Sequence, residues 1–318
     1  MHAVLINDDK SLTWREVPDP VRKEGEVLID IRAAGLNRAD LLQREGNYPP
    51  PPGWPEWMGL EVAGVVSAAG SDSRWRSGDR VCALLGGGGY AEQVAVPDGM
   101  VLPIPEGLDF VEAAAIPEAF ATSYLNLCIE GGLQVGDTVF IQAGASGLGM
   151  AAIQLAKHRA AKVITTVGSE AKAEFVRSLG ADVVIDRRRE EIATVLARHP
   201  VDIALDCVAG PHLGPCLKTM APGGRWIVIA TLGGTQSDLD MRDFFRRGVT
   251  LIGSTLRSRS SAMKVEILAR LETELWPAFV SGAIKLKIHA TVPMPCAATA
   301  HDMLQASQNL GKVILTRE

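Results

Sequence analysis

The sequence predicts an α/β protein built on a doubly wound, six-stranded parallel sheet, with a second domain that consists mainly of β-strands. Three observations support this fold class. Strands and helices alternate from about residue 137, a glycine-rich turn follows the first of these strands, and shorter strand-like segments separated by Gly and Pro precede it. The chain has 318 residues, which is enough for two domains.

The first third of the chain contains short apolar segments of the kind that form β-strands. They cover residues 27–31, 62–66, 81–85 and 91–96. A helix is expected to begin near Asn37 and to end before the four prolines at 49–52, because consecutive prolines cannot continue a helix. Strand-like segments continue on both sides of this proline run, so we interpret it as a rigid surface loop and not as a polyproline linker.

Strands and helices then alternate with the spacing of βαβ units. Expected strands cover residues 138–141, 163–167, 183–185, 203–206, 225–230 and 250–253, and the helices between them cover 148–160, 171–179, 190–198, 213–220 and 241–247. This order predicts a parallel sheet with helices on both faces, and six strands match the doubly wound dinucleotide-binding fold. A helix at 262–280 and further elements at 287–292, 297–307 and 312–316 are expected to return to the first domain. The predicted domains are residues 1–120 with 266–318, and residues 121–265.

Composition excludes several classes of protein. Positive residues number 32 and negative residues 37, so the net charge of −5 does not favour binding to nucleic acid. Five widely spaced cysteines contain no C-x-x-C pair, which indicates neither a disulfide framework nor a cysteine-rich zinc site. The N-terminal apolar stretch is too short for a signal peptide, and no segment approaches a membrane span. We therefore expect a cytoplasmic protein without a membrane partner.

The glycine-rich turn at residues 144–149 gives the sharpest signal. An apolar strand leads into it and a helix follows at once, the context in which such a turn binds a dinucleotide. Gly144 is expected to allow the tight turn, Gly147 to leave room for the pyrophosphate, and Gly149 to let helix and strand pack closely. The G-x-G-x-x-G pattern would have a glycine where Ser146 stands. With Leu148, these residues form the predicted pyrophosphate site of a Rossmann domain, at the positive end of a helix.

The end of the second strand indicates which dinucleotide binds. An NAD-binding domain usually has Asp or Glu there, whereas this strand ends in Gly168 and Ser169. Lys172 follows in the next helix and Arg187 follows the third strand. Two cations suit a 2′-phosphate better than a hydroxyl, so we predict NADPH as cofactor. Glu170 argues against NADPH, unless this residue serves only to cap the start of its helix. Both cations could also be solvated surface charges.

Several segments together resemble a known family. They are Gly35-Leu36-Asn37-Arg38-Ala39-Asp40, the proline loop, Gly59-Leu60-Glu61-Val62-Ala63-Gly64, the turn at 143–149, Leu256-Arg257-Ser258-Arg259 and Asn309-Leu310-Gly311-Lys312-Val313. The chain resembles the medium-chain dehydrogenase/reductase superfamily, and within it the zinc-free quinone oxidoreductase branch. This resemblance covers nearly the whole chain. It implies a GroES-like fold for the mainly β catalytic domain and a homodimer formed by sheet edges at residues 250–254.

The chain departs from the zinc alcohol dehydrogenases of that superfamily at their metal ligands. Those relatives have a cysteine in the segment that matches Gly35–Asp40 and a histidine before the glutamate that matches Glu61. Here the first segment has no cysteine, and Leu60 replaces the histidine. A leucine cannot bind zinc, and a catalytic zinc needs three protein ligands. We therefore predict no metal site.

The resemblance also implies roles for individual residues. Asn37 and Asp40 match positions near the nicotinamide, and Tyr48 matches a tyrosine beside it, so these three are the predicted catalytic residues. Helix capping, surface charge and packing on the prolines are the respective alternatives. Cofactor contacts are implied for Thr122, Leu256, Asn309 and Lys312. For Thr122 the alternative is a hydrogen bond back to its own helix, and for Lys312 it is a solvated charge.

The expected reaction is metal-free transfer of a hydride from NADPH to a quinone, which can delocalise the negative charge that it receives. Two alternatives stay open. The same fold serves reductases of α,β-unsaturated carbonyls, for which the acceptor is an enone. A sensor that binds NADPH, or contacts RNA, with little turnover is the third possibility, and the acidic net charge argues against RNA.

Overall fold

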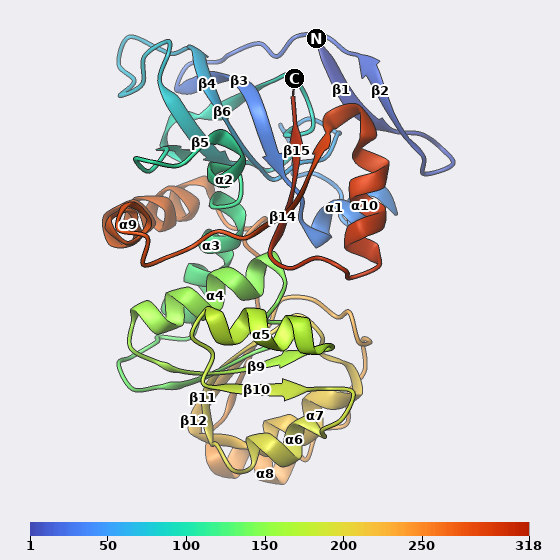
Figure 1. Ribbon diagram of the computed structural model, residues 1–318, viewed down its shortest axis with the longest axis vertical. Helices are drawn as coiled ribbons and strands as arrows, with labels where there is room; N and C mark the ends of the chain where they lie inside the picture. Colours follow the sequence, from blue (N-terminus) through green and yellow to red (C-terminus); the bar gives the residue numbers. More distant parts are fainter. Residues whose placement is uncertain (318) are drawn as a thin grey trace. The chain divides into compact units, whose positions relative to one another are not determined.

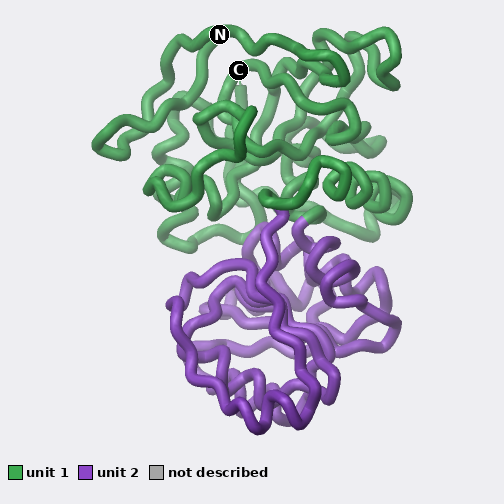
Figure 2. Tube along the Cα trace, turned by 180° about the vertical axis from the view of Figure 1, so that it is seen from behind, with its two compact units in different colours: residues 1–121, 257–318 green, residues 122–256 purple. Residues whose placement is uncertain are grey.

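The computed structural model describes residues 1–317, and the chain divides into two compact units (Figure 2). Unit 1 comprises Met1–Ala121 and Arg257–Glu318, and unit 2 comprises Thr122–Leu256. The chain therefore returns to unit 1 before the predicted boundary at residue 265. The long helix that follows this return belongs wholly to unit 1.

Unit 1 is built on a seven-stranded sheet that combines strands from both ends of the chain (Figure 1). Its order is β14 (Ile288–Pro293), β15 (Lys312–Thr316), β3 (Glu26–Gly35), β4 (Glu61–Ala68), β5 (Arg80–Leu84) and β7 (Val101–Pro103), and β6 (Gln93–Pro97) also pairs with β3. β15 runs antiparallel to β3, so the C-terminal strand completes this sheet, as predicted. A separate hairpin of β1 (His2–Ile6) and β2 (Leu12–Glu16) was not predicted, and neither was the three-residue β7.

In the described part of the chain, five helices belong to or begin in unit 1: α1 (Arg38–Arg44), α2 (Phe110–Ala113), α3 (Pro117–Tyr124), α9 (Ser261–Val280) and α10 (Ala297–Gln305). The 3₁₀ turns η1 (Asp98–Met100) and η4 (Met294–Cys296) join them, and α3 continues as the π-helical turn η2 (Leu125–Glu130). No helix or strand lies between α1 and β4, so the prolines form a loop, as predicted. Within residues 1–317, no helix is both long and apolar enough to cross a membrane.

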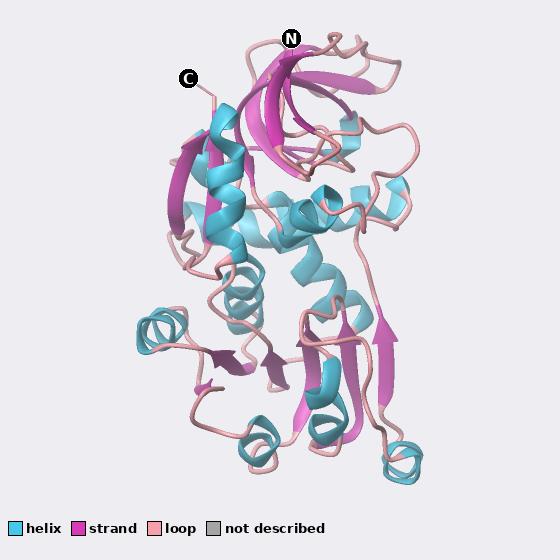
Figure 3. Cartoon of the chain, turned by 90° about the vertical axis from the view of Figure 1, so that its right-hand side faces the viewer, coloured by secondary structure: helices cyan, strands magenta, loops and turns pink. Residues whose placement is uncertain are grey.

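Unit 2 is a six-stranded sheet in which every pair of neighbouring strands is parallel. The order is β10 (Val183–Asp186), β9 (Lys162–Val167), β8 (Thr138–Ile141), β11 (Val201–Asp206), β12 (Met220–Val228) and β13 (Thr250–Gly253). Helices α4 (Gly147–His158) and α5 (Glu170–Ser178) cover one face, and α6 (Ile192–Leu196), α7 (Leu213–Leu217) and α8 (Met241–Arg247) cover the other (Figures 1 and 3). This is the predicted doubly wound Rossmann arrangement. α6 and α7 are shorter than predicted, and β12 already begins at Met220.

The core of unit 2 packs against the sheet around Trp226, which is fully buried and lies 5.7 Å from the ring of Phe140. Trp226 Nε1 donates to Asp206 Oδ2 at 2.9 Å. The other oxygen of Asp206 accepts the amides of Val208 and Ala209. A buried carboxylate thus ties the end of β11 to the neighbouring strand, and this fixes the edge of the sheet at which parallel α/β folds bind ligands.

Candidate functional site

The glycine-rich turn connects β8 to α4 with almost no free space. Ala143 has a positive φ of 56°, so the strained position of the turn is not a glycine. A Cβ on Gly144 would lie 2.1 Å from Thr165 Oγ1 on β9, and a Cβ on Gly149 would lie 2.5 Å from the Gly144 carbonyl oxygen. Both positions therefore require glycine because the backbone approaches its neighbours so closely, and Gly144 does so without a positive φ.

The first turn of α4 leaves two amides available for an anion. Ser146 caps the helix by accepting the amide of Gly149 at 3.0 Å. Among residues 1–317, no acceptor binds the amides of Gly147 and Leu148. α4 has 12 residues, so its positive end adds to these donors. The turn therefore fits the pyrophosphate of a dinucleotide.

Positive charges gather where β9 and β10 end. Ser169 caps α5 and accepts the amide of Lys172 at 3.4 Å, and a Cβ on Gly168 would lie 3.4 Å from Arg187 Nε. Burial lowers the pKa of Lys172 first, and the like charges of Arg187 and Arg188 lower it further. Glu170 makes an ion pair with Arg177 at 3.0 Å, at a distance of two helical turns. Lys172 and Arg187 thus bring two positive charges to Gly168 and Ser169 at the end of β9.

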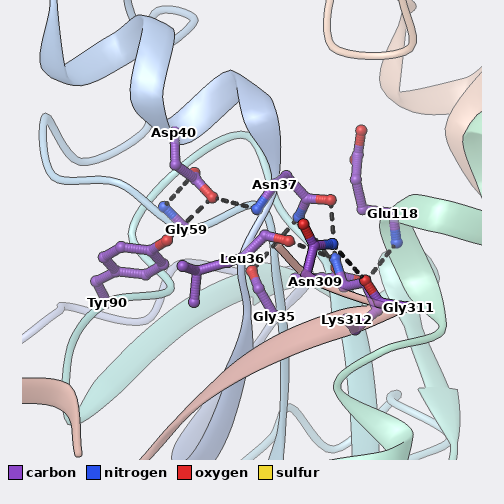
Figure 4. A network of polar contacts seen from close by, with 11 residues as sticks. Gly35, Leu36, Asn37, Asp40, Gly59, Tyr90, Glu118, Asn309, Gly311 and Lys312 are labelled. Atoms are coloured by element: carbon purple, nitrogen blue, oxygen red, sulfur yellow. Dashed lines mark hydrogen bonds and ion pairs between the residues drawn. The ribbon is translucent and has the colours of Figure 1, made fainter. Parts of the chain in front are cut away.

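The polar centre of unit 1 consists of Asn37, Glu61 and Lys312 (Figure 4). The Lys312 ammonium donates to Glu61 Oε1, to the Leu36 carbonyl oxygen at 2.6 Å and to Asn37 Oδ1 at 2.9 Å. Asn37 Nδ2 donates to Glu61 Oε1 at 3.0 Å, and the Glu118 amide donates to Glu61 Oε2 at 2.9 Å. The side chains of Lys312 and Glu61 are 2% and 0% exposed. All three protons of the ammonium are used, so Lys312 holds Asn37 and leaves no donor for a cofactor.

Asp40 lies beside this centre and is entirely buried. Its Oδ2 accepts the Asn37 amide at 2.7 Å and the Tyr90 hydroxyl at 3.0 Å, and its Oδ1 accepts the Gly59 amide at 3.3 Å (Figure 4). Burial raises the pKa of Asp40 to about 6, against the opposing effect of these hydrogen bonds. A residue without exposed surface cannot touch a substrate in this conformation. Asp40 instead orients Asn37 at the start of α1.

Tyr48 is half-buried at the head of the proline loop. Its carbonyl oxygen accepts Arg257 Nη1 at 2.8 Å, and the Arg257 guanidinium lies 4.6 Å from the centre of its ring. Trp54, in the same loop, packs closely on Gly86. A Cβ added to Gly86 would lie 2.6 Å from Trp54 Nε1. The loop is thus fixed against the segment that follows β5.

The remaining predicted residues occupy separate places. Thr122 lies in α3, where its carbonyl oxygen accepts Asn126 Nδ2 at 2.7 Å. Leu256 is 4% exposed and is the last residue of unit 2. Asn309 is buried and donates to the Gly311 carbonyl oxygen at 2.8 Å, which shapes the turn before β15.

Three residues of these networks were missed or left out as site residues by sequence reasoning. Glu61 was named only as part of a segment that matches the family, yet it joins Asn37 to Lys312. Arg257 was named only as part of a segment that matches the family and was given no role, although it contacts Tyr48. Tyr90 contacts Asp40 across 50 positions of sequence. The match of residues 256–259 to the family was a usable signal for Arg257, whereas nothing local to Tyr90 indicated its partner.

Two family models match the chain. Residues 23–106 match the alcohol dehydrogenase GroES-like domain, and residues 147–272 match the zinc-binding dehydrogenase domain. The human quinone oxidoreductase is 30% identical over 307 residues, with 94% of this chain and 92% of the relative covered. The synaptic vesicle membrane protein VAT-1 homolog of Rattus norvegicus is also 30% identical, and 97% and 81% of the two chains are covered.

Solved structures extend the similarity to the whole fold. A mycobacterial protein complexed with NADPH has a TM-score of 0.86 at 29% identity, with 99% of each chain covered. The CurK enoyl reductase has a TM-score of 0.86 at 25% identity, with 100% of this chain and 99% of that chain covered. The predicted combination of a GroES-like and a Rossmann domain is thereby confirmed.

Proposed function

This chain belongs to the quinone oxidoreductase branch of the medium-chain dehydrogenase/reductase superfamily, and we propose that it transfers a hydride from NADPH to a quinone without a metal ion. Family membership makes the protein an oxidoreductase that uses a nicotinamide cofactor. The observation that carries the proposal is the buried Glu61–Lys312 pair. It supplies a fixed ammonium to the segments in which zinc-dependent members have metal ligands.

The residues at that place do not fit zinc, although one matching family model is described as zinc-binding. The segment Gly35–Asp40, where the zinc-dependent relatives have a cysteine, contains none, and Leu60 stands in place of their histidine and is 2% exposed. Within residues 1–317, no group of three or more His, Cys, Asp or Glu side chains could hold a metal ion. We therefore assign no step to zinc.

Unit 2 offers donors for both charged parts of NADPH. The amides of Gly147 and Leu148 would bind the pyrophosphate, and the Ser169 hydroxyl, Lys172 and Arg187 would bind the 2′-phosphate. When bound, the cofactor supplies the hydride. The choice of NADPH over NADH rests on the cation cluster at the end of β9, together with the pairing of Glu170 with Arg177.

Unit 1 supplies the residues for the acceptor. A quinone delocalises the added charge, so the protein has to orient it, exclude water and provide one proton. We assign the proton to the Tyr48 hydroxyl, which lies on a half-buried side chain. The Asn37 amide, held by Lys312 and Glu61, is assigned to orient the reacting ring.

Oxidation of NADPH by EDTA-treated protein with a planar ortho-quinone tests this function, with NADH run in parallel. Turnover that prefers NADPH and survives EDTA supports it. In a Lys172→Ala/Arg187→Ala variant the ratio of kcat/KM for NADPH over NADH should fall by at least about tenfold, because two charge-assisted hydrogen bonds are lost. The exposed Arg198 provides the control substitution Arg198→Ala. Turnover that requires added zinc, or an unchanged cofactor ratio, would contradict the assignment.

Reduction of an α,β-unsaturated carbonyl is the second candidate. It is favoured by the similarity to the CurK enoyl reductase over the whole chain. The same assay with a linear enone in place of the quinone separates the two reactions. A kcat/KM for the enone above that for the quinone would assign the enone as substrate.

We propose a homodimer formed through β13. This strand pairs with β12 on one side only, and Leu251 on it is 37% exposed. Met241 and Phe245 of α8 are 60% and 70% exposed as well. An apolar sheet edge of this kind favours pairing with a second copy. The cytoplasmic location is also a proposal, supported by five free cysteines, which a reducing compartment preserves.

A further inference from the structure

Two buried cations of unit 1, Arg257 and Lys264, contact each other, and Arg257 also contacts Tyr48. Arg257 is 8% exposed, and its guanidinium carbon lies 4.6 Å from the centre of the Tyr48 ring. Lys264 on α9 is 5% exposed and donates to the Arg257 carbonyl oxygen at 2.9 Å. The half-buried tyrosine thus has its ring face against a positive charge that solvent scarcely reaches.

Neither cation has a carboxylate partner. The guanidinium donates to the carbonyl oxygens of Gly86 and Tyr48 and to Gln43 Oε1, all of them neutral. Within residues 1–317, no carboxylate lies at ion-pair distance from Arg257 or Lys264. Burial accordingly lowers the pKa of both groups. Burying a charge without a counter-ion in contact is costly, so an anion that forms beside these cations is stabilised by them.

The carboxylates that surround Arg257 do not contact it. Asp40 on α1 and Glu118 on α3 raise the pKa of Arg257 through space without contacting it. Asp40 already accepts three hydrogen bonds elsewhere. The largest opposing effect on Arg257 comes from Tyr48, whose negative form would favour the charged guanidinium. Because such an interaction is mutual, a charged Arg257 also favours the phenolate of Tyr48.

The contacts of Arg257 also fix the position of Tyr48. One side chain binds the loop at Tyr48, the segment after β5 at Gly86, and α1 at Gln43. Gln43 in turn donates to the Glu56 carbonyl oxygen at 2.8 Å, which secures the far end of the same loop. The planar guanidinium group can make these bonds at once because it has several N–H donors. The ammonium of a lysine at position 257 could not.

We propose that Arg257, supported by Lys264, positions Tyr48 and stabilises its phenolate, so that Tyr48 can give up a proton during the reaction. This role rests on the proposed reduction of a quinone by NADPH. Hydride addition places two electrons and one hydrogen on the quinone and leaves an oxygen anion. The O–H bond of Tyr48 then breaks, and a new O–H bond forms on that oxygen. Water then returns a proton to the Tyr48 phenolate.

Titration of the tyrosines tests the proposal without cofactor or substrate. The chain has only three tyrosines. Burial raises the pKa of Tyr90 well above its ordinary value, so Tyr90 stays protonated while the fold persists. Near-ultraviolet absorbance of tyrosinate, with the Tyr48→Phe protein subtracted, isolates the ionisation of Tyr48. We expect this ionisation in the unmodified protein below the ordinary value of about 10. Ionisation at or above that value would overturn the proposal, whatever the variants do.

Arg257→Gln keeps hydrogen-bonding atoms and removes the charge. It should raise the midpoint of Tyr48 ionisation by about one pH unit or more, and Arg257→Lys should restore only part of the shift. Arg159→Gln is the matched control, because Arg159 lies 5.4 Å from the ring of a different tyrosine, Tyr124. An unchanged Tyr48 midpoint in a folded Arg257→Gln protein would refute the coupling.

Kinetics separate this role from a merely structural one. In Arg257→Gln, kcat should fall, its loss at alkaline pH should move upward with the Tyr48 midpoint, and the KM for NADPH should stay unchanged. Tyr48→Phe should abolish that alkaline limb. A shifted titration without any quinone turnover would refute the proposed reaction and leave the Arg257–Tyr48 coupling standing. Turnover with an unshifted titration would refute the coupling alone.

Discussion

Replacing Lys312 by methionine removes the charge from the polar centre of unit 1 and preserves most of the side-chain volume. The ammonium loses its bonds to Glu61, to the Leu36 carbonyl oxygen and to Asn37 Oδ1. Glu61 then keeps only Asn37 Nδ2 and the Glu118 amide as donors. Because Glu61 is wholly buried, solvent cannot replace the missing cation.

Removing one partner of a buried ion pair costs about 3–5 kcal/mol, since the other charge remains buried. For a unit of this size, each kcal/mol lowers the Tm by about 2–4 °C. The Lys312→Met protein should therefore melt about 10 °C below the wild type. Adding Glu61→Gln removes the second charge as well, and this double variant should regain about half of the loss or more.

Thermal unfolding followed by tryptophan fluorescence measures this effect in unit 1, which contains Lys312. The tryptophans of unit 1 are Trp14, Trp54, Trp57, Trp75 and Trp276, and unit 2 has only Trp226. Arg270→Met, which breaks the exposed ion pair with Glu266, is the control and should change stability by less than about 1 kcal/mol. Our reasoning is refuted if Lys312→Met melts like this control, or if the double variant is no more stable than Lys312→Met.

Three further predictions concern other parts of the chain. Gly149→Ala places a Cβ against the Gly144 carbonyl oxygen, so NADPH should no longer raise the Tm of the protein; normal protection by NADPH would contradict this. The pKa of Asp40 in the fold, about 6, lies above its unfolded value, so Asp40 stabilises the fold at low pH and loses that contribution as the pH rises from about 4 to 6. Asp40→Asn should therefore gain up to about 3 kcal/mol relative to the wild type between pH 4 and pH 7, measured by denaturant unfolding; a constant difference would contradict it. Leu251→Arg places a charge on the exposed edge of β13 and should yield monomers in analytical ultracentrifugation, whereas an unchanged dimer would place the interface elsewhere.

Local sequence patterns were sufficient for the architecture. Alternating apolar segments predicted all six strands of unit 2 in their correct order of occurrence, because parallel strands buried on both faces are almost continuously apolar. The prolines at 49–52 predicted the end of α1 and a loop after it, since their rings exclude helix. The β1–β2 hairpin escaped prediction because β2 is only partly buried and its sequence, Leu-Thr-Trp-Arg-Glu, alternates weakly.

The candidate site was predicted only in part. The turn at 143–149 is a local structure, so its residues and its helix end follow from contiguous sequence. Lys312 was expected at a cofactor, but its ammonium is used up by Glu61, Asn37 and Leu36. Asp40 was expected as a catalytic residue, and the structure shows it entirely buried, with both of its oxygens accepting hydrogen bonds.

By itself, the sequence determined the strand and helix segments, the glycine-rich turn before α4 and the leucine that precedes Glu61, because each depends on residues close together in the chain. Only the tertiary structure decided which charges meet. Glu61 and Lys312 are 251 positions apart, and Tyr48 and Arg257 are 209 apart. Partners at such separations are chosen by the pairing of β15 with β3 and by the return of the chain to unit 1. The burial that makes these charges consequential also arises only when the sheets pack, since no local pattern sets how much water reaches a side chain.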